Sequence, residues 1–255
     1  MTIRSMRLLA VVLMSASFGL AQSSSATAPT KPIPRTADGK PDLSGVWQGG
    51  GVSLYGDAED GTQRKYAAPV NPPPKREPLP YQAWAQTKSK TFTSADDPTL
   101  RCLLPGIPRI TSMPMPFEIV QTPKEVVIAY ESYHAFRIIP INDKLQHPND
   151  LVPTWMGDAV ARWDGDTLVV DVTGFNDKTW LSGTGSIHSE DLHVVERFQL
   201  NSDDTITYTA TVTDPKVLTK PWTTGALLRR PPNTRVEEYE CIENNQDAQH
   251  MEVKK

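Results

Sequence analysis

From residue 117 onward, apolar and polar residues alternate in short runs separated by turn residues such as 122–124 and 201–204. A period of two predicts β-strands with one buried face. An earlier run, 42–47, has the same character. The later runs predicted as strands are 117–121, 125–131, 134–141, 159–163, 167–173, 193–200, 205–213, 225–229 and 236–242.

The segment 159–175 carries the clearest of these signals. Its two runs flank Asp164-Gly165-Asp166, and Asp-Gly is a strong hairpin signal, whether the turn is 164–165 or 165–166. One predicted face is wholly apolar: Ala159, Ala161, Trp163, Leu168, Val170 and Val172. The other carries Val160, Arg162, Val169, Asp171 and Thr173. Because this second face mixes both charges with β-branched residues, we expect it to border a polar cavity.

About ten short strands at this spacing are typical of a mainly β, antiparallel protein. We expect a closed β-barrel, with a β-sandwich as the alternative. One short helix is predicted at 81–92, where Pro80 suits the first helical position. The proline-rich stretch 69–80 excludes a helix and indicates an extended surface wrap. Two long loops, 142–158 and 176–191, are candidates for function.

The N-terminus has the pattern of a secretory signal peptide. Arg4 and Arg7 precede an apolar run at 8–20, and Gly19-Leu20-Ala21 fits a cleavage site. We predict a signal peptide at 1–21, with an uncleaved anchor as the alternative, then a flexible lead at 22–41 and a single β-domain at 42–255. The mature protein is expected to be periplasmic or secreted, without a transmembrane span.

Charge and motifs exclude several classes of function. The formal net charge is −4 and no basic stripe is present, so nucleic acid is not an expected partner. The chain carries neither a phosphate loop nor a dinucleotide fingerprint, so no cofactor is expected. The two cysteines, Cys102 and Cys241, are expected to form a disulfide in an exported protein; two free buried thiols are the alternative.

Several motifs resemble known families. Gly45-Val46-Trp47, on the first predicted strand, resembles the G-x-W motif that opens lipocalin barrels, which makes the expected barrel lipocalin-like. Four longer motifs are TADGKPDLSGVW (36–47), RCLLPGIPR (101–109), RWDGDTLVVDVTGF (162–175) and HSEDLHVVERF (188–198). Together they are similar to a large family of exported bacterial proteins common in Acidobacteria. That resemblance implies export and a single β-rich domain, and it assigns no activity or catalytic residue.

Four histidines within sixty residues are candidates for chemistry: His134, His147, His188 and His193. Imidazoles suit acid–base work or metal binding, but the spacing matches no metal motif and no metal is assigned. The alternative is that backbone groups or water satisfy them. On one extended strand His188 and His193 would point to opposite faces, so they can share a ligand only if 189–191 turns.

Glu196 is the most informative single residue. Alternation places it with Val194, Phe198 and Leu200, so an inward apolar face would bury its carboxylate. A buried carboxylate needs a cation, which Arg137 or Arg162 can supply. Catalysis and a structural ion pair remain equal interpretations.

Two loop tryptophans, Trp155 and Trp180, suit either a ligand pocket or the seal of a barrel end. We therefore consider three hypotheses. The first is a cofactor-independent acid–base enzyme acting on a small molecule, such as a lyase, isomerase, cyclase or hydratase. In it, Glu196 or Asp171 is the acid or base, a histidine the partner, and Arg137 or Arg162 the electrostatic stabiliser. The second is a non-catalytic, lipocalin-like small-ligand binding protein, and the third a structural surface protein. The oligomeric state stays open.

Overall fold

The computed structural model describes residues 32–49, 78–183, 185–243 and 245. The expected signal peptide, residues 22–31 of the expected lead and residues 69–77 of the proline-rich wrap lie outside the described residues. Residues 35–41 of the lead form a hydrogen-bonded turn, and Arg35 pairs with Asp166 at 2.6 and 3.0 Å. No helix in the described part of the chain combines the length and apolar character needed to cross a membrane.

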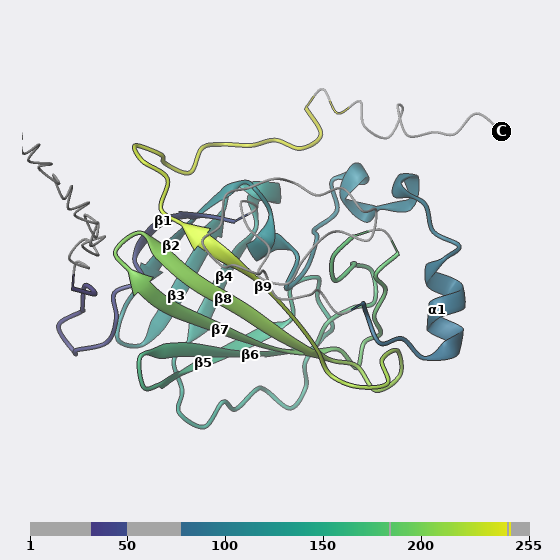
Figure 1. Ribbon diagram of the computed structural model, residues 1–255, viewed down its shortest axis with the longest axis horizontal. Helices are drawn as coiled ribbons and strands as arrows, with labels where there is room; N and C mark the ends of the chain where they lie inside the picture. The colour runs from purple at the N-terminus through teal and green to yellow at the C-terminus, as the bar shows by residue number, and fades with distance from the viewer. Residues whose placement is uncertain (1–31, 50–77, 184, 244, 246–255) are drawn as a thin grey trace, which may run out of the picture. The chain divides into compact units, whose positions relative to one another are not determined.

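Nine strands form one antiparallel sheet in the order β4-β3-β2-β1-β9-β8-β7-β6-β5 (Figure 1). The strands are β1 Gly45–Gln48, β2 Pro116–Gln121, β3 Glu125–Tyr130, β4 Phe136–Pro140, β5 Asp158–Asp164, β6 Thr167–Thr173, β7 His193–Ser202, β8 Thr205–Thr213 and β9 Trp222–Arg229. The predicted mainly β, antiparallel fold is confirmed.

The sheet is not closed into a barrel, which corrects that part of the prediction. Its edge strands are β4 and β5, and a single parallel bridge, between Ile141 and Ala161, joins them in the described chain. The number of strands explains the opening. In a sheet of nine alternating strands the two edges run in the same direction, so a closing ladder would have to be parallel.

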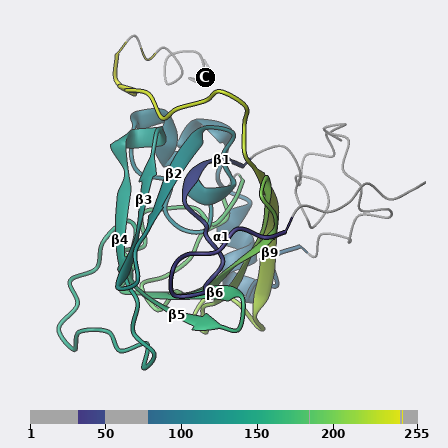
Figure 2. The same ribbon diagram turned by 90° about the vertical axis from the view of Figure 1, so that its left-hand side faces the viewer.

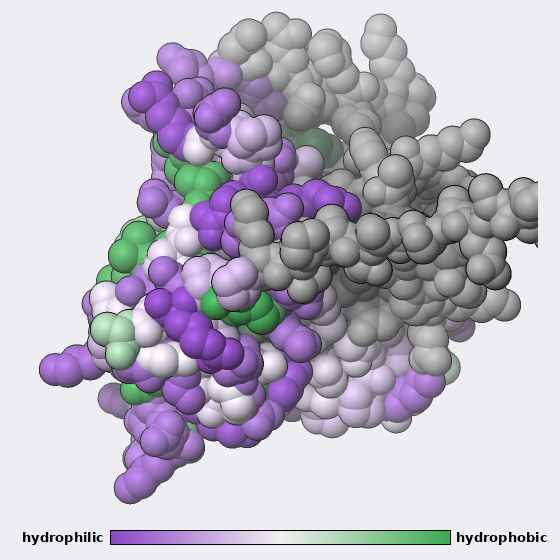
Figure 3. All heavy atoms as spheres, turned by 60° about the vertical axis from the view of Figure 1, so that its left-hand side comes forward, coloured by the Kyte–Doolittle hydropathy of each residue, from purple (hydrophilic) through white to green (hydrophobic). Residues whose placement is uncertain are grey.

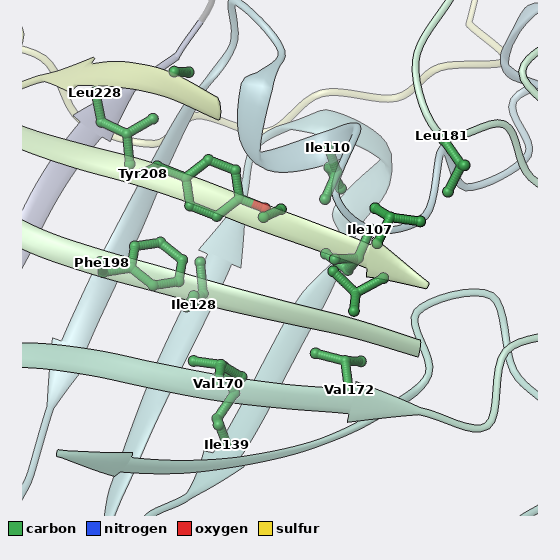
Figure 4. Packing of buried hydrophobic residues seen from close by; sticks show 14 of the residues in the cluster. Ile107, Ile110, Ile128, Ile139, Val170, Val172, Leu181, Phe198, Tyr208 and Leu228 are labelled. Atoms are coloured by element: carbon green, nitrogen blue, oxygen red, sulfur yellow. The ribbon is translucent and has the colours of Figure 1, made fainter. Parts of the chain in front are cut away.

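The sheet curves strongly, so that β2–β4 face β7–β9 across the core (Figure 2). Figure 4 shows Phe198 and Tyr208 on one wall packing towards Ile128 and Ile139 on the other. All four side chains are at most 1% exposed. The inward phase that alternation favoured for β7 is confirmed, because Phe198 faces the core.

The predicted hairpin joins β5 to β6 through Gly165-Asp166, because Asp164 pairs with Thr167. Gly165 has φ 58°, which a glycine adopts without strain. The apolar face of the hairpin is buried in the core. The mixed polar face, which includes Asp171, lies on the outside of the sheet.

One end of the core is sealed by a cation over an aromatic ring. The guanidinium of Arg230 lies 4.3 Å from the Trp47 ring centroid, and the Trp47 indole donates to the Leu43 carbonyl at 2.8 Å. Gly45 has φ 122°, and a Cβ there would collide with Arg230. The G-x-W motif therefore combines a glycine that makes room for the arginine with a tryptophan that the arginine covers.

The predicted helix is shorter than expected. Helix α1 spans Ala83–Ser89, because the backbone just before it pairs with 217–219 instead: the Gln82 N–H donates to the Val217 carbonyl at 2.8 Å. Four short 3-10 helices precede or interrupt the early strands: η1 Ser94–Asp96, η2 Pro98–Arg101, η3 Ile110–Ser112 and η4 Ser132–His134.

The strand predicted at 236–242 does not form. Two prolines, Pro231 and Pro232, follow β9 and lack the N–H groups that a strand ladder needs, so they separate the segment from the sheet. The segment is attached by the predicted disulfide between Cys102 and Cys241, which is confirmed.

Candidate functional site

Four ionisable side chains and one hydroxyl meet on the outer face of the sheet; we call them the His–Asp cluster. They form a chain of contacts. His147 Nδ1 lies 2.6 Å from Asp158 Oδ1, and His147 Nε2 lies 3.0 Å from Asp171 Oδ1. The other Asp171 oxygen, Oδ2, lies 2.9 Å from His193 Nε2, and His193 Nδ1 lies 3.4 Å from Thr213 Oγ1.

Strand register explains how these residues meet. Asp158 pairs with Thr173 at the end of the β5–β6 hairpin, and His193 pairs with Thr213 where β7 begins and β8 ends. Asp171 lies on β6 two residues before Thr173, so its side chain is on the same face of the sheet. From there it is a diagonal neighbour of both Asp158 and His193. The loop between β4 and β5 then folds back over the strands and supplies His147.

His147 lies between two carboxylates. Its Nδ1 faces Asp158 and its Nε2 faces Asp171. With its side chain 13% exposed, His147 bridges these two residues and holds the loop against them.

His193 is bonded differently. Its Nε2 donates to Asp171, so in the neutral ring the lone pair is on Nδ1. The side chain is 41% exposed, and the Thr213 hydroxyl beside Nδ1 is also within reach of the His193 carbonyl oxygen at 3.3 Å. A carboxylate thus orients an imidazole whose basic nitrogen lies near solvent.

A second polar group occupies the core. Arg137 from β4 binds Glu196 from β7 with both terminal nitrogens, at 3.2 and 2.5 Å. The Tyr208 hydroxyl donates to the same carboxylate at 2.9 Å. Beside this group the Thr111 and Tyr130 hydroxyls are 3.1 Å apart. Sequence reasoning required an inward Glu196 with a cationic partner, and the structure provides both.

The surroundings of this pair indicate a structural role. Burial disfavours the charge on Arg137, but the Glu196 carboxylate outweighs burial and raises the pKa of Arg137 above its ordinary value. Burial, and then the same carboxylate, raise the pKa of Tyr208. Glu196 and Tyr208 have no exposed surface, so a substrate has no access to the carboxylate.

The other predicted histidines lie outside the cluster. Residues 189–191 do turn, yet His188 has partners of its own: the Thr179 hydroxyl at 2.6 Å and the Ser189 carbonyl at 3.0 Å. Burial lowers the pKa of His188 below its ordinary value, which keeps the ring neutral. His134 is half exposed, and its nearest ionic contact is Glu240 at 3.9 Å.

The remaining predicted residues are also dispersed. Arg162 lies on the outer face of β5 and therefore cannot reach Glu196. Trp180 is buried and packs edge-on against Phe92, whereas Lys178 lies over the ring of Trp155 at 5.9 Å. No shared pocket is evident for the two tryptophans among the described contacts.

Two members of the His–Asp cluster, Asp158 and Thr213, were missed by sequence reasoning. Alternation from Val160 back to Asp158, and from Thr211 to Thr213, places both on the outer face, and that signal was available. In the described chain, no group of three or more His, Cys, Asp or Glu side chains has an arrangement suited to a metal ion. Comparison with family models, curated proteins and solved structures found no match to this chain.

Proposed function

We propose that this protein is an exported, cofactor-independent acid–base enzyme that acts on a small polar molecule, with His193 as its general base. One observation carries the proposal: Asp171 holds Nε2 of a partly exposed histidine, so the lone pair of the neutral ring is on Nδ1, beside the Thr213 hydroxyl. An imidazole oriented by a carboxylate is a common general base at neutral pH.

Each residue has a distinct part in this proposal. His193 Nδ1 takes a proton from the substrate, and the resulting imidazolium is stabilised by the Asp171 carboxylate beside Nε2. His147 donates to the other oxygen of Asp171 and so keeps that carboxylate from rotating away. Asp158 in turn holds His147, which makes these two residues positioning groups rather than reactants.

The reaction class follows from what the cluster contains. It offers a base, hydrogen-bond donors and a hydroxyl. Proton abstraction followed by elimination, isomerisation, cyclisation or hydration fits such a set. Its substrate is a small molecule that brings an acidic C–H or O–H group.

The alternative of a lipocalin-like ligand carrier is less well supported. A carrier needs space in its centre, but Glu196, Phe198, Tyr208 and Ile128 in the described core are at most 1% exposed. The His–Asp cluster, by contrast, is partly accessible and lies on the outer face of the sheet. These observations favour chemistry at the surface over storage in the core.

Export is supported by the Cys102–Cys241 disulfide, which is typical of oxidising, extracytoplasmic compartments. A periplasmic or secreted destination follows if the N-terminal segment acts as a signal peptide.

The proposed base can be tested before the natural substrate is known. A suitable probe is 5-nitrobenzisoxazole, whose ring opens to a coloured phenolate when a base removes its ring proton. We expect the wild-type protein to accelerate this reaction above the rate in buffer. His193→Gln should reduce the acceleration about tenfold or more, because it removes the base. Asp171→Asn should reduce it by a smaller factor, because the imidazole remains but is less well oriented.

His134→Gln is the matched control, since it removes an exposed histidine that lies outside the cluster. Circular dichroism establishes that each variant is folded. Equal rates for wild type and His193→Gln, or no rate above buffer for any protein, would refute His193 as a general base.

A further inference from the structure

The outer face of β2–β4 carries a group of apolar side chains that the proposed chemistry does not use. Three are unusually exposed for their size: Phe136 at 67%, Ile138 at 57% and Val120 at 49%. Val127 and Ala129 lie between them on β3. We call these five residues the β2–β4 patch. In Figure 3, apolar side chains interrupt a mostly hydrophilic surface in several places.

Strand register makes the patch continuous. Val120 pairs with Val127, and Val127 pairs with Ile138, which gives one row across three strands. Ala129 pairs with Phe136 in the neighbouring row. Contiguous exposed apolar surface of this kind marks an interaction site more often than isolated residues do.

The patch also borders the sheet edge formed by β4, which β5 meets only at the Ile141–Ala161 bridge among the described residues. Strand β4 is an edge strand, and its hydrogen bonds to β3 involve the odd-numbered residues: the Tyr130 N–H donates to the Ala135 carbonyl, and the Ile141 N–H to the Lys124 carbonyl. The backbone groups of Phe136 and Ile138 therefore point away from β3, towards the edge. Such groups can pair with an added extended segment.

Acidic residues surround the patch. Glu118 and Glu125 lie on the same outer face, in the rows of Phe136 and Pro140 respectively. The C-terminal segment 237–243 adds Glu237, Glu238, Glu240 and Glu243, which are all exposed.

This acidic segment is held beside the start of β4. The Glu237 N–H donates to Glu131 at 3.0 Å, Tyr239 packs edge-on against Tyr133, and the disulfide at Cys241 anchors the segment. Although Arg235 pairs with Glu237 at 3.3 Å, negative charge predominates next to Phe136, the most exposed side chain of the β2–β4 patch.

From this combination we propose that the β2–β4 patch docks an extended segment of a partner protein in which apolar residues alternate with lysine or arginine. The apolar side chains would cover Phe136 and Ile138, the cations would lie against the glutamates, and the backbone would pair with β4 at Phe136 and Ile138, before the bridge to β5. Neither a second copy of this chain nor an anionic membrane has the complementary charge, because each would bring further negative charge to the acidic rim.

The test uses two nine-residue peptides, one alternating valine with lysine and the other alternating valine with glutamate. Fluorescence anisotropy of labelled peptides measures their binding to the full-length protein at low and at physiological ionic strength. We expect the lysine peptide to bind at least about tenfold more tightly than the glutamate peptide, with a preference that shrinks as salt is added.

Two variants identify the surface. Phe136→Ser combined with Ile138→Thr should weaken binding of the lysine peptide about tenfold or more, because the apolar contact is lost. Glu237→Gln with Glu238→Gln and Glu240→Gln should weaken it and flatten its salt dependence. Val152→Thr, which alters a valine that is 78% exposed in the β4–β5 loop, is the matched control and should have no effect.

Three outcomes would overturn the proposal. Equal affinity for both peptides would exclude the role of charge. Binding that survives both variants would place the site elsewhere. Sedimentation that shows a wild-type dimer, lost in the Phe136→Ser/Ile138→Thr variant, would assign the patch to a second copy of the chain instead.

Discussion

Replacing Glu196 by glutamine is expected to lower the free energy of unfolding by about 3–5 kcal/mol, because the change leaves a buried cation without its counter-ion. Arg137 is 5% exposed and gives both terminal nitrogens to this carboxylate. Glutamine keeps the volume and one acceptor oxygen, so the loss reports mainly on the missing charge.

The magnitude depends on removing one partner alone. The triple variant Arg137→Met/Glu196→Leu/Tyr208→Phe removes the cation, the anion and the hydroxyl that donates to it. Since well-packed apolar side chains often replace a buried ion pair without loss, we expect this variant to unfold within about 2 kcal/mol of the parent. It should be more stable than Glu196→Gln.

Urea denaturation followed by tryptophan fluorescence measures both changes, with the disulfide oxidised in every sample. The denaturation slope must be the same for the variants, so that midpoints can be compared as stabilities. A loss below about 1 kcal/mol for Glu196→Gln would refute the description of this pair as a buried, mutually dependent ion pair. The rate of the benzisoxazole reaction per folded molecule should be unchanged in this variant.

Three further outcomes are expected. Replacing Cys102 and Cys241 by serine should lower the free energy of unfolding by only about 2 kcal/mol, as measured by urea midpoints. Opening the full closed loop in the unfolded state alone would predict about 5 kcal/mol. The loss is smaller because the tail after β9 also gains freedom in the native state. The pKa of His188 lies below its ordinary value of about 6.5, so below that pH the unfolded chain takes up a proton that the native chain does not. As the pH is lowered below about 6.5, the free energy of unfolding should fall by up to about 1.4 kcal/mol per pH unit until the native pKa is passed. Urea midpoints measured across this range should depend less on pH for His188→Gln than for the wild type. Gly45→Ala should lower the free energy of unfolding by about 1–3 kcal/mol, measured by thermal unfolding, because φ is 122° and the added Cβ would collide with Arg230. Gly165→Ala should cost about 1 kcal/mol, because the added Cβ meets nothing within 4 Å. Equal losses at the two glycines would contradict this reasoning.

The sequence by itself determined most of the strands and the phase of those with one clearly apolar face; it left the phase of the strand around Arg137 open. A pleated strand places successive side chains on opposite faces, so the pattern around Val194, Glu196 and Phe198 is a local property that needs no knowledge of neighbours. The same holds for the hairpin turn at Gly165. The pairing of Cys102 with Cys241 followed from their being the only cysteines in a chain whose N-terminal sequence predicts export.

Tertiary structure alone decided which side chains meet. Arg137 rather than Arg162 reaches Glu196, because the curvature of the sheet brings β4 across the core from β7 while Arg162 lies on the opposite face. The register of β6 and β7 brings Asp171 to His193, and a loop that folds back over β6 adds His147. No period in the sequence encodes the path of that loop. Barrel closure likewise depended on strand number and direction, since nine alternating strands leave two edges that run the same way. Local pattern sets the face of a residue, whereas strand order and register set its partners.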